Sequence, residues 1–361
     1  MSTTTNYPQV HLGGPDGPLV SAIGYGAMGI GSSTYGVADE AEALAALTRA
    51  ADLGTTFWDT SDAYGASQAI IGKWFAQTGR RKEIFFATKF GAVDTRHPRG
   101  TPGFYKLNSK PSFIKMKIEE SLKVCQTDYI DLYYQHRVDS EVPVEIVMET
   151  FRPYLENGTI RYVGLSECSI DVMKRAKAVP GVGEKLVAVQ MEYNPFELEL
   201  ETTGFADVAR ELNISVVAYC PLGRGLMTGL YKSRADFEKT DIRQFLPRFS
   251  DENFASNITI VDKFKGVAAK HNATTGQVTL AWIMARQPGF ISIPGTRKIE
   301  RLEENAAAAF VKLDEEDMKE LNGAVDAAET KGERFPPAYA AVMNRECIPL
   351  SEWKGEEGLW L

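Results

Sequence analysis

Short apolar runs alternate with longer amphipathic stretches along most of the chain. This alternation predicts an N-terminal hairpin over 9–22 and then eight strand–helix units. The predicted strands cover 20–28, 56–59, 84–89, 130–136, 161–166, 186–192, 214–219 and 290–294. The predicted helices cover 38–53, 67–78, 111–124, 144–157, 170–178, 203–212, 254–271, 274–287, 298–308 and 314–327.

Eight nearly continuous apolar strands, separated by helices, favour a closed parallel sheet over an open one. We therefore expect an α/β fold of the (β/α)8 TIM-barrel type, with extra helices and the hairpin at its start. No linker or low-complexity segment interrupts the pattern, which predicts one domain over 1–361. Three connections on the strand-tip side are long: 90–110, 220–253 and the tail 330–361. Such loops are usually functional; we expect them to border a pocket, with the tail over the barrel mouth, although mobile surface loops would show the same composition.

Chemistry-bearing side chains stand at the ends of three successive predicted strands: Asp59, Lys89 and His136, with Tyr64 in the loop after Asp59. In a parallel barrel these strand ends meet on one face. A nearby ammonium is expected to lower the pKa of a phenol, a carboxylate to hold the lysine, and a neutral histidine to orient a carbonyl oxygen. Each residue alone also fits a structural role, such as an Asp59–Lys89 ion pair. Their joint placement predicts proton donation to a carbonyl group that receives a hydride.

The glycine-rich stretch over 24–29 matches the dinucleotide fingerprint G-x-G-x-x-G. That fingerprint has meaning only where the glycines open directly into a helix, and here polar residues intervene. We reject a Rossmann domain and expect the glycines, Gly26 among them, to let the backbone approach a ligand.

The net charge and the composition limit the kinds of binding partner that we expect for the protein. The 361 residues carry a formal net charge of −8, which argues against nucleic acid or an anionic membrane as the main partner. The first residues lack the pattern of a signal peptide, and no apolar run approaches the roughly 20 residues of a membrane helix. Four dispersed cysteines and four histidines show no metal-binding spacing. We expect a cytoplasmic protein without a bound metal.

Three motifs together resemble the aldo-keto reductase superfamily. They are Phe-Trp-Asp-Thr-Ser-Asp-Ala-Tyr-Gly over 57–65, Gly-Leu-Ser-Glu-Cys over 164–168 and Pro-Leu-Gly-Arg-Gly over 221–225. Within that superfamily, the motifs look like the fungal and plant branch that includes perakine reductase and YakC-type enzymes. The resemblance covers nearly the whole chain and implies a catalytic tetrad of Asp59, Tyr64, Lys89 and His136.

The resemblance further implies reduction of aldehydes or ketones by NADPH, which would lie extended across the strand tips. Ser166 and Gln190 would bind the nicotinamide carboxamide, and Tyr219 would stack on the ring. The other residues implied at the cofactor are Gly26, Pro221, Leu222, Arg224 and Gly225, the last three around the pyrophosphate. Met28 and Phe90 would border the substrate. Glu167 stands where many relatives have Asn, so a carboxamide contact from that position is doubtful.

The stretch over 293–305 resembles the adenosine-phosphate site of this family. Its implied contacts are Pro294, Gly295, Thr296, Arg297, Arg301, Glu304 and Asn305. Two arginines and a lysine at a helix start also suit an anion on physical grounds, because free backbone N–H groups already point there. A solvated helix end is the alternative. The local basic excess favours NADPH over NADH.

Two other functions stay open at this stage. The same site could run in reverse, as in the alcohol oxidation of pyridoxine-type dehydrogenases. Channel β subunits resemble the family as well and bind NADPH mainly as partner proteins, although the chain shows no long N-terminal extension. The natural substrate and the oligomeric state are not readable from the sequence.

Overall fold

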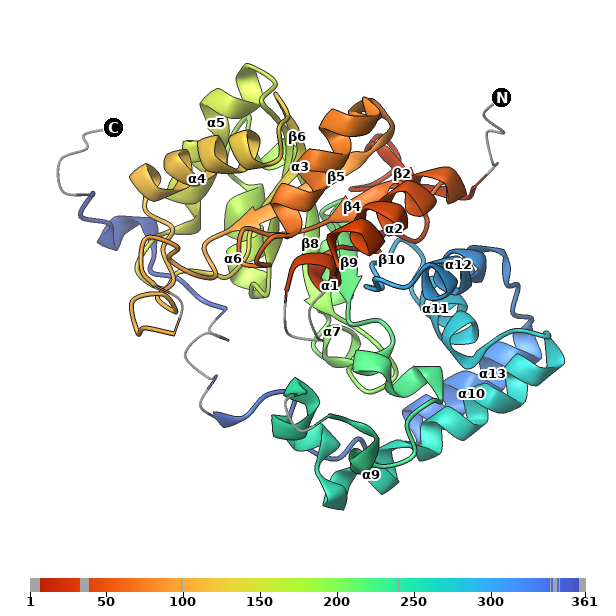
Figure 1. Ribbon diagram of the computed structural model, residues 1–361. Helices are drawn as coiled ribbons and strands as arrows, with labels where there is room; N and C mark the ends of the chain where they lie inside the picture. The colour runs from red at the N-terminus through yellow and green to blue at the C-terminus, as the bar shows by residue number, and fades with distance from the viewer. Residues whose placement is uncertain are drawn as a thin grey trace.

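The computed structural model of the protein describes residues 7–32, 39–98, 100–238, 241–337, 339, 343 and 345–356. Within them, helices surround a central sheet (Figure 1). Its parallel strands lie side by side in sequence order: β3 (Tyr25–Gly26), β4 (Phe57–Asp59), β5 (Phe85–Phe90), β6 (Ile130–Gln135), β7 (Ile160–Ser166), β8 (Leu186–Glu192), β9 (Ser215–Tyr219) and β10 (Ile291–Ser292).

The sheet closes on itself. Parallel bridges join Ile23 to Ser292 and Gly26 to Gly295, so the first and last strands are neighbours. The hairpin of β1 (Gln9–His11) and β2 (Leu19–Ser21) precedes the barrel. The predicted (β/α)8 barrel with an N-terminal hairpin is therefore confirmed.

Helices follow the strands as the amphipathic pattern predicts. They are α1 (Met28–Gly31), α2 (Glu40–Leu53), α3 (Ser67–Thr78), α4 (Pro111–Val124), α5 (Val144–Glu156), α6 (Ile170–Lys177), α7 (Glu199–Thr202), α8 (Phe205–Glu211), α9 (Asp251–Asn257), α10 (Thr259–Lys270), α11 (Thr275–Arg286), α12 (Ile299–Ala307) and α13 (Glu315–Asp326). Local signals set their ends: Thr274 and Gln277 form a capping box at α11, and Gly54 ends α2 at a φ of 87°.

Three predicted elements differ from those observed. The strand expected over 20–28 is divided between β2 and the two-residue β3, and Met28 begins α1. The helix expected over 203–212 is α8, which begins only after Gly204 with its φ of 73°, and the separate short helix α7 before it was not predicted. The helix expected over 254–271 becomes α9 and α10, and Asn257 at the junction hydrogen-bonds the backbone of Arg248 and Lys331.

The alternation of strand residues creates two separate apolar layers. In β4, Phe57 belongs to the cluster inside the barrel, whereas Trp58 belongs to the layer between strands and helices. Trp58 packs on Trp74 and Phe75 of α3, with ring centroids 4.8 and 6.2 Å apart. The next residue, Asp59, returns to the interior side, where it ends the strand.

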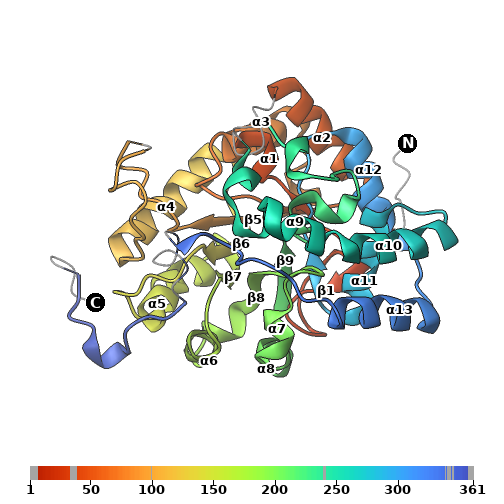
Figure 2. The same cartoon turned by 90° about the horizontal axis from the view of Figure 1, so that it is seen from below.

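The chain beyond α13 returns to the strand-tip side of the barrel and crosses it (Figure 2). Near its start, the backbone of Lys331 bonds to Asn257. Farther on, Ile348 N donates to the carbonyl oxygen of Ser140, in the connection between β6 and α5, at 3.1 Å. The segment thus spans from α9 to the start of α5.

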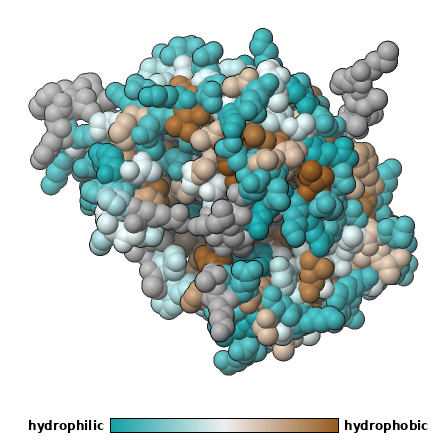
Figure 3. All heavy atoms as spheres, in the orientation of Figure 1, coloured by the Kyte–Doolittle hydropathy of each residue, from teal (hydrophilic) through white to brown (hydrophobic). Residues whose placement is uncertain are grey.

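The face of the molecule in Figure 3 is mainly polar, and apolar residues appear there in small separate groups. Of the helices that the model describes, none combines the length and the apolar character needed to cross a membrane.

Gly164 tests how tightly the barrel interior is packed. A Cβ at this position in β7 would lie 2.4 Å from the ring of Tyr134 on the neighbouring strand. Gly164→Ala should therefore lower the free energy of unfolding by about 1–3 kcal/mol. Gly323→Ala is the matched control, because its Cβ would meet nothing within 4 Å, and alanine should stabilise α13 by up to about 1 kcal/mol. Urea unfolding measures both, and equal effects would contradict this account.

Candidate active site

A buried ion pair stands at the tips of β4 and β5. The side chain of Lys89 is 0% exposed and that of Asp59 is 3% exposed, and the two are in direct contact. Lys89 Nζ also donates to the carbonyl oxygen of Thr60 at 2.8 Å, and Gln190 Nε2 donates to the second carboxylate oxygen of Asp59 at 2.8 Å. Burial lowers the pKa of Lys89 and raises that of Asp59, while their mutual attraction acts in the opposite direction.

Tyr64 and His136 face this pair. Lys89 Nζ lies 5.0 Å from the centroid of the Tyr64 ring, and the rings of Tyr64 and His136 meet edge to face with centroids 5.5 Å apart. Ser61 Oγ lies 2.9 Å from His136 Nδ1. All four side chains that the sequence singled out are thus gathered on one side of the barrel.

Burial keeps His136 uncharged. It lowers the pKa of the imidazole well below its ordinary value, and the positive charges of Lys89 and Arg137 lower it further. The Ser61 hydroxyl has one proton and two nearby acceptors, His136 Nδ1 at 2.9 Å and Asp62 Oδ1 at 3.2 Å. When it donates to the nearer Nδ1, the proton of the neutral ring is on Nε2, which is then a hydrogen-bond donor. The role of Ser61 was not apparent from the sequence, where it is one of several small residues in a loop.

The pKa of Tyr64 differs from the sequence-based expectation. Burial raises it above its ordinary value, and the negative charge of Asp59 raises it further. Arg137 is the group that lowers it, and the expected lowering by Lys89 is not found. Lys89 and Asp59 are in direct contact, so the phenol meets both charges of the pair, and the raising effect of Asp59 on the pKa of Tyr64 is the larger. Tyr64 is accordingly a protonated phenol throughout the neutral pH range.

The neighbouring strand tips carry further polar groups. Ser166 of β7 pairs in register with Gln190 of β8, and both side chains are almost fully buried. Arg137, directly after His136, bonds to the His136 carbonyl oxygen at 3.0 Å and approaches Ser166 Oγ at 3.4 Å. In the sequence, only the position of Arg137 next to His136 indicated that it could belong to the site.

The carboxylate of Glu167 is fully buried and has several partners. It accepts hydrogen bonds from the Tyr219 hydroxyl at 2.7 Å, from Arg334 at 2.8 Å and from Arg345 at 2.9 Å. Burial alone would raise its pKa, but Arg334, Arg137 and Arg345 outweigh that effect and lower it to about 2. Glu167 is thus a charged anchor, which agrees with the doubt about a carboxamide contact. Nothing in the sequence pointed to either tail arginine.

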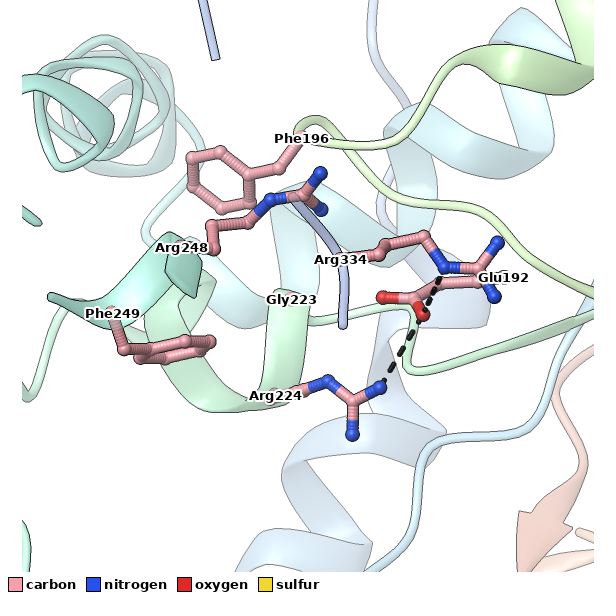
Figure 4. A pocket seen from close by; sticks show the side chains of 7 residues that line it. All are labelled: Glu192, Phe196, Gly223, Arg224, Arg248, Phe249 and Arg334. Atoms are coloured by element: carbon pink, nitrogen blue, oxygen red, sulfur yellow. Dashed lines mark hydrogen bonds and ion pairs between the residues drawn. The ribbon is translucent and has the colours of Figure 1, made fainter. Parts of the chain in front are cut away.

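The connection after β9 forms the adjoining wall. Arg224 lies 3.4 Å from Glu192 of β8, and Arg243 donates to the Arg224 carbonyl oxygen at 3.0 Å. Gly223, Arg224 and Gly225 have φ values of 55°, 54° and 95°, a left-handed run that two glycines make accessible. Pro221 and Leu222 lie directly before this run. Figure 4 shows Arg224 and Arg334 on either side of Glu192 in a pocket that Phe196 and Phe249 also line.

The basic stretch near α12 connects to the barrel tip. Gly26 bridges to Gly295, next to Pro294, and the Tyr25 hydroxyl donates to the Thr296 carbonyl oxygen at 2.6 Å. At α12 no side chain caps the helix start, so its first N–H groups are available. Arg301 pairs with Glu304 at 2.5 Å, and its side chain remains 40% exposed. Asn305 is buried, and Arg297 precedes the helix.

The structure does not support one of the two expected substrate-pocket residues. Phe90 is fully buried and stacks on Tyr133 with ring centroids 5.4 Å apart, and it also packs against Phe151 of α5. As the neighbour of inward-facing Lys89, it points to the outer layer of the barrel. Met28 is partly exposed at the start of α1. Among the residues that the model describes, no His, Cys, Asp and Glu cluster could hold a metal ion.

A closed parallel barrel with acid–base side chains at the carboxyl ends of its strands is the arrangement of a (β/α)8-barrel enzyme. The model of the aldo/keto reductase family matches residues 22–326, and the chain belongs to this family. The resemblance seen in the motifs is thereby confirmed.

Two fungal relatives are similar over nearly their whole length. The chain is 46% identical over 335 residues to the aldo-keto reductase YakC [NADP(+)] of Schizosaccharomyces pombe, covering 92% of this chain and 96% of the relative. It is 45% identical over 338 residues to the aldo-keto reductase Str7 of Strobilurus tenacellus, with the same coverage. The glycerol dehydrogenase structure from Gluconobacter oxydans superposes with a TM-score of 0.80 at 24% identity, covering 92% of this chain and 99% of that one; this likeness shows the fold.

Removing one member of the buried pair should be costly. Asp59→Asn leaves the Lys89 ammonium without its carboxylate and should lower the free energy of unfolding by about 3–5 kcal/mol. Adding Lys89→Met should recover part of the loss, because both charges are then gone. Asp207→Asn is the control: it breaks the exposed pair with Arg210 and should cost less than about 1 kcal/mol. Equal losses for both aspartates in urea unfolding would contradict this view of the pair.

Proposed function

We propose that the protein reduces aldehydes or ketones to alcohols with NADPH as the hydride source and Tyr64 as the proton donor. The observation that carries this proposal is the gathering of Asp59, Lys89, Tyr64 and His136 at adjoining strand tips. Membership in the aldo/keto reductase family supports the reaction class, and the fission-yeast relative, which is named as an NADP(+) aldo-keto reductase, supports NADP as the cofactor. The partner is a small carbonyl compound.

The residues present suit a dinucleotide that lies across the strand tips. The Ser166 hydroxyl and the Gln190 amide, side by side in register, offer a donor and an acceptor for a carboxamide. The uncapped start of α12 and the nearby Arg301 offer donors for phosphate. Between them, the left-handed run at Gly223 to Gly225 brings backbone close to the same face. Bound NADPH supplies the hydride.

The four tip residues divide the remaining work. His136, neutral because of its low pKa, donates from Nε2 to a substrate carbonyl oxygen and orients it. Tyr64 gives that oxygen its proton as negative charge develops there. Lys89 provides positive charge beside the phenol, and Asp59 with Gln190 fixes the ammonium in place. An alkoxide is more basic than a phenolate, so the transfer from a high-pKa phenol is downhill.

The same electrostatics hold Tyr64 in the protonated form from which carbonyl reduction starts. Alcohol oxidation requires Tyr64 as a phenolate base, and burial together with Asp59 disfavours that form.

Turnover itself separates an enzyme from a channel-β-subunit-like partner protein. Consumption of NADPH with 4-nitrobenzaldehyde or another member of a broad carbonyl panel supports the enzyme, and no turnover with any of them would overturn it.

We also propose one domain over 1–361, because the tail returns to β7 and β8.

Tyr64→Phe deletes the proposed proton donor and leaves the ring in place. We expect kcat for carbonyl reduction to fall about 10²–10⁴-fold, the usual share of a general acid, with NADPH affinity almost unchanged. Tyr129→Phe is the matched control, because that ring stacks between Arg81 and Arg161 at the opposite end of β6. Steady-state kinetics and NADPH titration measure both variants. Turnover of the Tyr64 variant close to wild type would exclude the role.

Arg301→Ala tests the adenosine-phosphate site that we propose at α12, where the 2′-phosphate of NADPH would bind. Loss of a charge-assisted contact should weaken NADPH binding about tenfold or more and leave NADH binding nearly unchanged. Arg49→Ala is the control, since Arg49 pairs with Glu303 on the same helix and loses the same charge. Fluorescence titration with both cofactors gives the comparison. An equal loss for NADPH and NADH would show that Arg301 does not read the phosphate.

A further inference from the structure

Two buried carboxylates stand on the face where the proposed mechanism places an anionic cofactor. Glu167 follows the last residue of β7 and its side chain is 0% exposed, while Glu192 ends β8 with 3% exposed. A buried carboxylate requires an opposite charge and hydrogen-bond donors. Unless both are neutralised by the protein, they repel the phosphates of a dinucleotide.

Arg334 forms ion pairs with both carboxylates, and the pair with Glu167 is also a hydrogen bond, whereas the pair with Glu192 rests on distance alone. Its Nη2 lies 2.8 Å from Glu167 Oε1 and its Nε lies 3.2 Å from Glu192 Oε2. Figure 4 shows the guanidinium beside Glu192, with Arg224 on the other side of the same carboxylate. The Arg334 side chain is only 12% exposed, so its geometry is held by packing. It comes from the tail, 167 positions after Glu167.

The same guanidinium holds the hydroxyl of Tyr219. Arg334 Nη2 donates to that oxygen at 3.0 Å, and the hydroxyl donates in turn to Glu167 Oε1 at 2.7 Å. Burial and the charge of Glu167 raise the pKa of Tyr219 well above its ordinary value, so the phenol stays protonated and keeps its donor role. Arg334, Tyr219 and Glu167 therefore form a closed triangle that fixes the Tyr219 ring.

Arg345 offers a natural comparison within the same tail. It binds Glu167 Oε2 at 2.9 Å and Glu199 at 2.7 Å, and its carbonyl oxygen accepts from Ser169 N at 3.0 Å. Within the part of the chain that the structure describes, the Arg345 guanidinium makes its hydrogen bonds and ion pairs with Glu167 and Glu199, and none with Tyr219 or Glu192. Both arginines thus tie the tail to Glu167, but Arg334 alone of the two also holds the ring at the proposed nicotinamide site.

We propose that Arg334 is a positioning residue for the cofactor: it holds Tyr219 in the orientation that stacks on the nicotinamide and neutralises Glu167 and Glu192 beneath it. This inference rests on the proposed function, since it takes Tyr219 as the stacking residue. It makes the C-terminal segment part of the cofactor site, not only a border of the substrate pocket. Arg345 anchors the tail without this effect.

The test compares Arg334→Met with Arg345→Met, which remove the same charge and one partner of Glu167 each. Fluorescence titration of the purified full chain gives the Kd for NADPH, and the emission of bound NADPH reports the nicotinamide environment. We expect Arg334→Met to raise Kd about tenfold or more, as for loss of charged hydrogen bonds, and to shift the emission. Arg345→Met should lower the thermal midpoint similarly but change Kd less than about threefold, because Arg334 still pairs with Glu167 and still holds the Tyr219 hydroxyl.

Tyr219→Phe keeps the ring and breaks the triangle, so it serves if Arg334→Met does not fold. It should reproduce the emission shift, and Arg334→Lys should restore part of the affinity but not the emission. Equal losses of affinity in the two methionine variants, in proportion to their losses of stability, would show a structural role only and overturn the inference. An unshifted emission in Tyr219→Phe would overturn it as well. Wild-type protein that binds no NADPH would overturn the proposed function itself, and this inference with it.

Discussion

A lysine and an aspartate, both withdrawn from water, face each other at the ends of neighbouring strands. A charge in such a place is very costly alone, so Lys89 and Asp59 must stay together, and Gln190 and the Thr60 carbonyl oxygen satisfy their remaining hydrogen bonds. The parallel barrel makes the pairing possible, because it ends each strand on the same face. Everything else at the site is arranged around this fixed dipole.

The dipole explains why Tyr64 keeps its proton. The Lys89 ammonium lies 5.0 Å from the centroid of the Tyr64 ring, but burial disfavours a charge on the phenol and the negative charge of Asp59 raises its pKa further. Burial also disfavours a charge on His136: together with the nearby Lys89 it lowers the pKa of the imidazole, so the ring stays neutral. The site is therefore composed of neutral donors around one ion pair. In the reaction that we propose, such groups would stabilise the charge that appears only as the carbonyl is reduced.

The periodic elements were predictable because local signals and tertiary packing agree. The helix over 67–78 was predicted to the residue, and Gly79 ends it at a φ of 68°. Strand alternation could also have placed Phe90, since the residue after inward-facing Lys89 must face outward. The sequence could not show how tightly the loops enclose Tyr64, or which charged residues far apart in the chain pair with each other. The pKa of Tyr64 depends on how tightly the loops close, and no local pattern connects Arg334 to Glu167.

That distant pairing has a consequence for the face as a whole. Glu167 and Glu192 lie on the face where we propose that a dinucleotide binds, yet each has arginine partners: Arg334 and Arg345 for the first, Arg334 and Arg224 for the second. Arg224 belongs to the loop expected at the pyrophosphate, so a phosphate and Glu192 compete for it. Arg334 contacts Glu192 independently of that loop. A tail arginine that stays with Glu192 would let Arg224 turn to a phosphate without leaving a buried carboxylate unpaired.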